Sequence, residues 1–190
     1  MDGLDPEGVR PTHEETLDLM ATSTQAIAPD RVSLVAPGLL TGVGFGMFVD
    51  GIVLHQLLQW HHLFSNGEAD RVGLPDRPSD TVDGLEFLVL WDGVFHAAAW
   101  VVVLVGLLWT VRRVAAAPRA GSWSPRSLVG LLIAGWGGFQ AFDMLVNHQL
   151  LAVHQIREDV ADPLLWDLGY LAVALLLVAA GTALHRTASR

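Results

Sequence analysis

Residues 44–62 combine a membrane-like apolar stretch with side chains that can bind metals or carry protons. The segment reads GFGMFVDGIVLHQLLQWHH and contains Asp50, His55, Gln56, His61 and His62. Ionisable groups cost a few kcal/mol each in hydrocarbon, so inside a membrane segment they usually mark a site or a pathway. The segment therefore predicts a functional centre within a transmembrane helix.

A second copy of this pattern lies 93 residues further along the chain. Seven of thirteen aligned positions are identical, whereas about one identity is expected by chance from average composition. The sequence therefore predicts two copies of one polar transmembrane unit. The identical pairs are Asp50 and Asp143, Val53 and Val146, His55 and His148, Gln56 and Gln149, Leu57 and Leu150, Leu58 and Leu151, and His61 and His154.

A weaker correspondence links two further segments, at an offset of 75 residues. Trp91-Asp92 and Trp166-Asp167 each open an apolar stretch, whereas His96 in the first has Leu171 as its counterpart in the second. Asp92 and His96 are four residues apart and so share one face of a helix. This Asp-x-x-x-His spacing resembles the carboxylate and imidazole pairs with which helical bundles hold metals.

Four apolar segments must position these residues: about 35–63, 85–111, 128–153 and 164–184. Each reaches the ~20 residues that cross a bilayer as a helix. We expect an all-α polytopic membrane protein, with its four transmembrane helices arranged as two tandem hairpins around a pseudo-twofold axis. The expected units are an acidic, mobile tail at 1–32 and a membrane domain at 33–187, with repeats at 33–113 and 127–187. Glycines such as Gly42, Gly44 and Gly46 are expected to allow close helix packing.

Composition excludes several other kinds of site. The chain has no cysteine and therefore no disulfide or thiolate site, and its net charge of −9 gives no sign of a nucleic-acid surface. The expected partners are the lipid bilayer and a metal ion, and a homo-oligomer is compatible with the sequence.

Arginine distribution predicts the orientation in the plasma membrane. Arg112, Arg113, Arg119 and Arg126 fall between the second and third segments with no acidic residue among them. The positive-inside rule places this loop and both termini in the cytoplasm. The acidic loops 65–83 and 157–163, and with them the Asp and His residues, are then extracytoplasmic. His13 and His185 are expected to lie away from the site.

Helical periodicity predicts which of these groups point the same way. At about 100° per residue, Asp50 and His61 fall within about 20° of each other, as do His55 and His62. Those two pairs lie on faces separated by about 120–140°, so one ligand is not easily shared between them. His61, His62 and His154 are expected to approach the outer interface.

Imidazole and carboxylate ligands favour Zn, Fe or Cu(II) over Cu(I), which prefers sulfur. We expect one or two ions, with His55, His96 and His148 as the primary imidazole ligands. Asp50, Asp92, Asp143 and Asp167 are expected to serve as further ligands or as acceptors for those imidazoles, with His61, His62 and His154 as the alternative set. The protein would act as a metalloenzyme or in metal handling.

Three other functions remain open on the sequence. Haem could be held between His55 and His148 in an electron-transfer protein, although four nearby carboxylates disfavour it. A polar network could serve only to specify helix packing. A proton-linked transporter is disfavoured, because the inner halves of the four segments contain almost no ionisable groups.

The run DGIVLHQLLQWHH at 50–62 resembles the signature of a bacterial family of predicted four-helix membrane proteins labelled as a domain of unknown function. The runs WDGVFH at 91–96 and NHQLL at 147–151 also resemble that family. The resemblance covers most of 38–185. It implies the four-helix topology and assigns no activity.

Overall fold

The computed structural model describes residues 12, 32–65, 73, 79–117 and 123–189. The chain divides into two units, Met1–Asp30 and Arg31–Arg190, and the second contains all the helices described below. The expected tail at 1–32 and His13 lie almost entirely outside the described residues. The elements are α2 (Val35–Val49), η1 (Asp50–Leu58), α3 (Val82–Ala115), α4 (Pro125–Asp143), η3 (Met144–Leu150) and α5 (Pro163–Ala188), where η denotes a π-helix.

Four helical spans long and apolar enough to cross a membrane confirm the predicted all-α membrane fold. They are Val35–Leu58, Val82–Ala115, Pro125–Leu150 and Pro163–Ala188. Local sequence starts two of them: the hydroxyl of Thr81 accepts from Gly84 N–H at the start of α3, and that of Ser124 accepts from Ser127 N–H at the start of α4. Such N-caps satisfy backbone donors that a new helix leaves without a partner.

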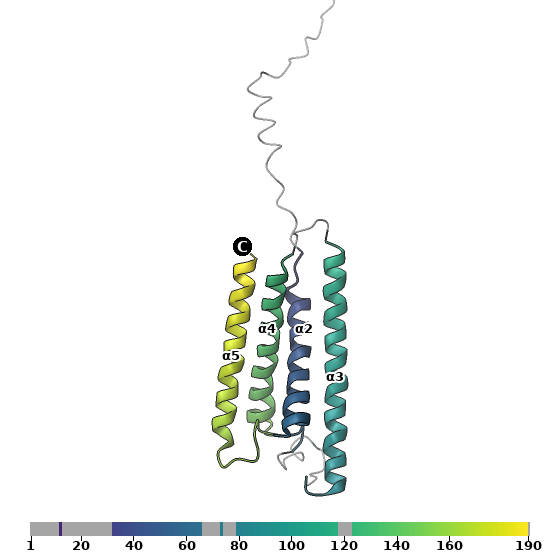
Figure 1. The fold of residues 1–190 in the computed structure, drawn as a ribbon, viewed down its shortest axis with the longest axis vertical. Helices are drawn as coiled ribbons and strands as arrows, with labels where there is room; N and C mark the ends of the chain where they lie inside the picture. Colours follow the sequence, from purple (N-terminus) through teal and green to yellow (C-terminus); the bar gives the residue numbers. More distant parts are fainter. Residues whose placement is uncertain (1–11, 13–31, 66–72, 74–78, 118–122, 190) are drawn as a thin grey trace, which may run out of the picture. The chain divides into compact units, whose positions relative to one another are not determined.

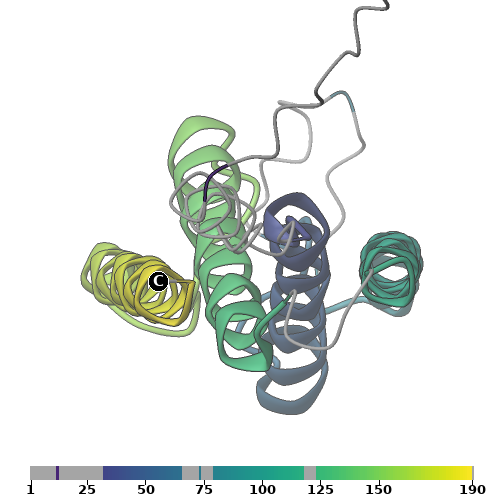
Figure 2. The same cartoon turned by 90° about the horizontal axis from the view of Figure 1, so that it is seen from above.

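The spans stand in the spatial order α3, α2, α4, α5, because α2 packs on α4 while α3 packs on α2 and α5 on α4. Figure 1 shows α2 and α4 in the middle, and Figure 2 shows α3 and α5 on opposite sides of that pair. Large apolar side chains such as Leu90, Val101 and Leu176 are exposed on the flanking helices. This is the composition of a surface that faces lipid.

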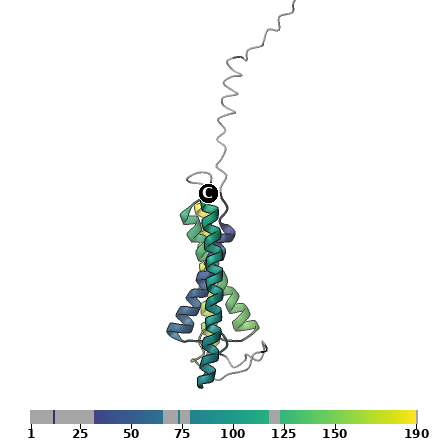
Figure 3. The same ribbon diagram turned by 90° about the vertical axis from the view of Figure 1, so that its right-hand side faces the viewer.

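Glycines allow α2 and α4 to touch through their backbones. A Cβ atom on Gly42 would lie 2.2 Å from the carbonyl oxygen of Leu132, and one on Gly135 would lie 2.2 Å from that of Leu39. The expected packing role of Gly42 is therefore confirmed. From this crossing the two helices diverge towards one end (Figure 3). We call it the acidic end, because it carries Asp50, Asp92, Asp143 and Asp167.

Candidate metal centre

Both central helices change from α to π geometry where the repeated motif begins. The π-helices run over Asp50–Leu58 and Met144–Leu150. In an α-helix residues five apart point about 140° away from each other, whereas the i→i+5 bonding of a π-helix brings them onto one side. This change explains why the Nε2 atom of His55 lies 3.3 Å from a carboxylate oxygen of Asp50. In the second copy, Nε2 of His148 lies 3.1 Å from a carboxylate oxygen of Asp143.

The chain then leaves the helix before it reaches the next histidine. Gln59 has φ of 51° and Ala152 has φ of 53°, so each copy turns through a left-handed residue after its π-helix. The apolar segments predicted to run to about 63 and 153 therefore leave helical geometry at Leu58 and Leu150. The predicted pairs do meet, Asp50 with His61 and His55 with His62, but the prediction that the two pairs lie on separate faces was wrong. The rings of His55 and His61, expected on different faces, lie 4.6 Å apart between centroids.

The turns bring His61 and His154 into the interior. They are 2% and 1% exposed, so neither ring is open to water, although both follow the ends of their helical spans. The Nδ1–H of His61 donates to the backbone carbonyl of Ile156 at 3.0 Å, and that of His154 donates to the carbonyl of Leu63 at 3.0 Å. A carbonyl oxygen only accepts, so in each ring Nδ1 carries a proton and Nε2 faces away from that carbonyl. A backbone carbonyl just after each copy of the motif thus accepts a hydrogen bond from the histidine of the other copy.

The Nε2 atoms of these two rings are buried inside the cluster, that of His154 3.8 Å from a carboxylate oxygen of Asp143. Neither His61 Nε2 nor His154 Nε2 has a hydrogen-bond partner among the residues that the structure describes, and the same holds for Oδ1 of Asp50. A buried polar atom without a partner costs about 1–3 kcal/mol. Unpartnered acceptors gathered in one place therefore point to a ligand.

Asp92 on α3 and Asp167 on α5 contact the other two imidazoles, those of His55 and His148. His55 Nδ1 donates to Asp92 at 3.0 Å, and His148 Nδ1 lies 3.2 Å from Asp167. Asp92 also accepts from the Leu63 N–H, and Asp167 from the Ile156 N–H. Gln56 and Gln149 donate to the other oxygens of the same carboxylates. With both oxygens occupied, Asp92 and Asp167 are placed as acceptors that orient imidazoles.

Two sets of side chains have the separations of a metal site. One is Asp50, His55 and His61, and the other is His61, His148 and His154, with candidate ligand atoms within 4.8 Å of one another in each set. Asp143 extends the second set, because its carboxylate oxygen lies 3.1 Å from His148 Nε2 and 3.8 Å from His154 Nε2. Two donors about 2.1 Å from one tetrahedral ion lie about 3.4 Å apart, close to the shorter contacts of 3.3 Å and 3.1 Å.

His62 and His96 take other positions. His62 Nδ1 donates to Asp92 at 2.7 Å, so it supports the acceptor of His55 from the partly exposed side. His96 Nδ1 donates to the backbone carbonyl of Asp92 at 2.7 Å, and its ring lies against the backbone at Gly51. The expected pairing of its ring with the Asp92 carboxylate is absent from these contacts. His96 belongs to neither set of candidate ligands.

The loops over the acidic end shift the pKa values of several groups. Burial, reinforced by the neighbouring imidazoles of His154, His55 and His148, holds the pKa of His61 well below its usual value, so the ring is neutral. Burial also raises the pKa of Glu158. The guanidinium of Arg157 lowers the pKa of Asp159 and lies 5.1 Å from the ring of Trp60 and 4.7 Å from that of Trp166.

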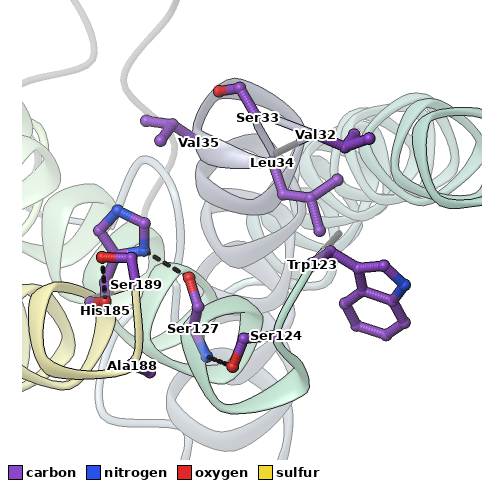
Figure 4. A pocket seen from close by; sticks show the side chains of 10 residues that line it. All are labelled: Val32, Ser33, Leu34, Val35, Trp123, Ser124, Ser127, His185, Ala188 and Ser189. Atoms are coloured by element: carbon purple, nitrogen blue, oxygen red, sulfur yellow. Dashed lines mark hydrogen bonds between the residues drawn. The ribbon is translucent and has the colours of Figure 1, made fainter. Parts of the chain in front are cut away.

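The opposite end of the helices holds a different cavity. It measures about 290 Å³ and lies between the chain before α2, the start of α4 and the end of α5 (Figure 4). Ser127 and His185 form a hydrogen bond of 2.8 Å in its wall. His185 therefore lies away from the candidate metal ligands, as its place in the sequence predicts.

Sequence reasoning missed the backbone partners of the histidines. The carbonyls of Leu63 and Ile156 belong to residues 93 apart, so extending the repeat comparison to loop residues would have paired them. No sequence pattern indicates a hydrogen bond between the two copies, because that contact depends on how the loops cross. Gln140, which is 1% exposed, was also missed.

Fold and site together define an integral membrane protein with a buried cluster of histidines and aspartates at one end of its helices. The chain belongs to DUF2243, a family described as predicted membrane proteins, whose model matches residues 37–188. No curated protein and no solved structure matches it.

Proposed function

We propose that this protein binds transition-metal ions at the acidic end of its helices. The observation that carries the proposal is that the Nε2 atoms of His61 and His154 are buried without a hydrogen-bond partner in the described structure. Each belongs to an imidazole fixed through its Nδ1–H to a backbone carbonyl. Metal-ligating histidines are oriented in this way, with the distal N–H donating to a carbonyl or carboxylate.

The donors divide into two half-sites, each from one copy of the motif. Asp50, His55 and His61 form one, and Asp143, His148 and His154 form the other, so the centre has room for one ion or for two. Imidazole nitrogen and carboxylate oxygen suit Zn, Fe or Cu(II). Three protein donors per ion leave a coordination position for water or substrate, as in catalytic zinc sites. A metalloenzyme is therefore favoured over a storage protein with saturated ligands.

Two alternatives predict different structures around the histidines. A network that serves only packing would pair its buried polar atoms with one another. Here the Nε2 atom of His61 has no hydrogen-bond partner within the described residues, and that of His154 lies 3.8 Å from the carboxylate of Asp143, too far for a hydrogen bond. A haem between two axial histidines needs a slot as wide as the porphyrin. The imidazoles instead contact one another directly, with centroids 4.4 Å apart for His148 and His154 and 4.6 Å for His55 and His61.

The test is elemental analysis of the purified protein together with its absorption spectrum. We expect stoichiometric Zn, Fe or Cu and no Soret band. The double variant His61→Ala/His154→Ala should lose the metal, while His96→Ala, whose ring belongs to neither half-site, should retain it. Circular dichroism and size-exclusion chromatography establish that each variant is folded.

The opposite results would contradict the proposal. A Soret band in the purified protein would replace it with haem binding. Folded wild-type protein that takes up none of these metals on reconstitution would leave only the packing network. Full metal content in the folded double variant would show that other residues bind the metal.

A further inference from the structure

An apolar pocket of about 350 Å³ opens beside the metal centre, on the side of α5. It is large enough for a small ligand, since such sites measure about 300–1,000 Å³. Gly169 leaves it open, because a Cβ atom there would meet no described atom within 4 Å. Its lining includes Trp60, Ile156, Leu165, Trp166, Gly169 and Tyr170.

The inner wall of this pocket is also a wall of the metal centre. Ile156, whose carbonyl holds His61, is 1% exposed and belongs to a buried apolar cluster against which Trp60 and Tyr170 pack. A molecule in the pocket therefore lies against the residue whose carbonyl holds His61.

Tyr170 supplies a hydroxyl to this mainly apolar lining. It is the only tyrosine in the chain, and a phenol can both donate and accept a hydrogen bond. The buried amide of Gln140, which is 1% exposed, lies beside Tyr170 but is not part of the lining. A neutral ligand head that reaches Tyr170 can therefore form a hydrogen bond there.

The outer wall faces hydrocarbon. Leu165 is 67% exposed on a membrane span, so what enters here comes from the lipid phase. The nearest cation is Arg157 over the rings of Trp60 and Trp166, and its charge is already paired with Asp159 at 2.8 Å. No described residue lining the pocket is charged, and a charged ligand would be costly at this position.

We propose that this pocket takes a membrane-dissolved amphiphile with a hydrocarbon body and a neutral carbonyl or hydroxyl head. The body lies between Trp60, Leu165 and Trp166, and the head reaches Tyr170. The inference rests on the proposed metal function, because the ligand belongs to the class of substrate that the metal centre would receive. It concerns binding alone and assigns no reaction step.

The test uses decylubiquinone as the probe and tryptophan fluorescence as the readout, because Trp60 and Trp166 line the pocket and quinones quench indole emission. In nanodiscs we expect saturable quenching of the wild-type protein. Gly169→Leu fills the open pocket and should weaken binding at least about tenfold. Gly138→Leu is the matched control: its Cβ also meets no atom within 4 Å, it lies on α4 outside the pocket, and its affinity should match the wild type.

A second variant tests the head group. Tyr170→Phe keeps the ring and removes the hydroxyl. It should weaken the binding of decylubiquinone, whereas the affinity of decylbenzene, measured by its competition with decylubiquinone, should stay unchanged. Quenching that never saturates, or that is equal in Gly169→Leu and Gly138→Leu, would show that ordinary lipid fills the pocket and would overturn the inference.

Metal content measured on the same samples separates the two proposals. Metal present with unsaturable quenching removes only the pocket proposal, and saturable, Gly169-dependent quenching without metal removes only the metal centre. Gly169→Leu should keep the full metal content of the wild type.

Discussion

The imidazole rings of His61 and His154 lie face to face, with centroids 4.8 Å apart and planes inclined by 3°. Each ring is held by a carbonyl of the other copy of the motif, His61 by Ile156 and His154 by Leu63. Neither helical hairpin can therefore complete the site alone. The two loops interlock at the centre, and the four imidazoles come into mutual contact only when both copies are folded.

Removing one orienting carboxylate should weaken the metal centre without abolishing it. Asp92→Asn and Asp167→Asn keep the shape of the side chain but reduce its strength as an acceptor for His55 and His148. We expect each to lower metal affinity by about 10–100-fold, with similar losses because the two contacts are alike. Titration against a chromophoric chelator measures this. Glu86→Gln, an exposed acid in α3, should leave affinity unchanged, and equal affinity in all three variants would refute the orienting role.

Enlarging the glycines of the central crossing should destabilise the fold. In Gly42→Val or Gly135→Val the new Cβ atom collides with a backbone oxygen at 2.2 Å, which a rotamer change cannot relieve. Overpacking of this kind costs about 1–3 kcal/mol or more. Thermal unfolding in detergent should show a clear loss for both variants. Gly138→Val, where the added atom meets open space, should unfold near the wild-type temperature; an equal loss there would argue against the crossing as the cause.

The stability contributed by Glu158 should depend on pH. Burial raises its pKa above the ordinary value of 4.5, so the folded protein holds this proton more tightly than the unfolded chain. Its ionisation therefore disfavours folding as the pH rises through the raised pKa. Glu158→Gln should be more stable than wild type at neutral pH and equally stable well below about pH 4.5. Unfolding curves over this range measure the difference, and a difference that grows towards low pH would have the wrong sign.

The orientation in the membrane is open to a direct test. The arginines near the ends of α3 and α4 predict that a reporter fused near Ala117 lies in the cytoplasm and that one inserted near Asn66 lies outside. The reverse pattern in paired alkaline phosphatase and fluorescent protein fusions would move the metal centre to the cytoplasmic face.

The number of spans was readable from sequence because each depends on local composition. About 20 apolar residues suffice to cross a bilayer whatever their neighbours are, and the observed spans begin within about three residues of the predicted positions. The motif repeat was readable for the same reason, since it is a property of the order of residues. The pseudo-twofold axis itself stays a prediction, although contacts such as those of Gly42 and Gly135 occur in matching pairs.

Which histidines meet was decided only by the tertiary structure. Periodicity assumed α-helix throughout 50–62 and put His55 and His61 on different faces. The π-helix from Asp50 and the left-handed turn at Gln59 changed the direction of every later side chain. As a result, the Nδ1–H of His61 donates to the backbone carbonyl of Ile156, which is 95 residues away in the sequence.

Sequence thus determined which chemical groups are present and at which end of the helices they lie, because composition and order are local properties. It could not determine the angles at which those groups meet. Helices of π type are rare and occur mostly as short insertions within α-helices, so a periodicity of 3.6 residues does not predict where they begin. The hydrogen bonds that cross between the two loops join residues more than 90 positions apart.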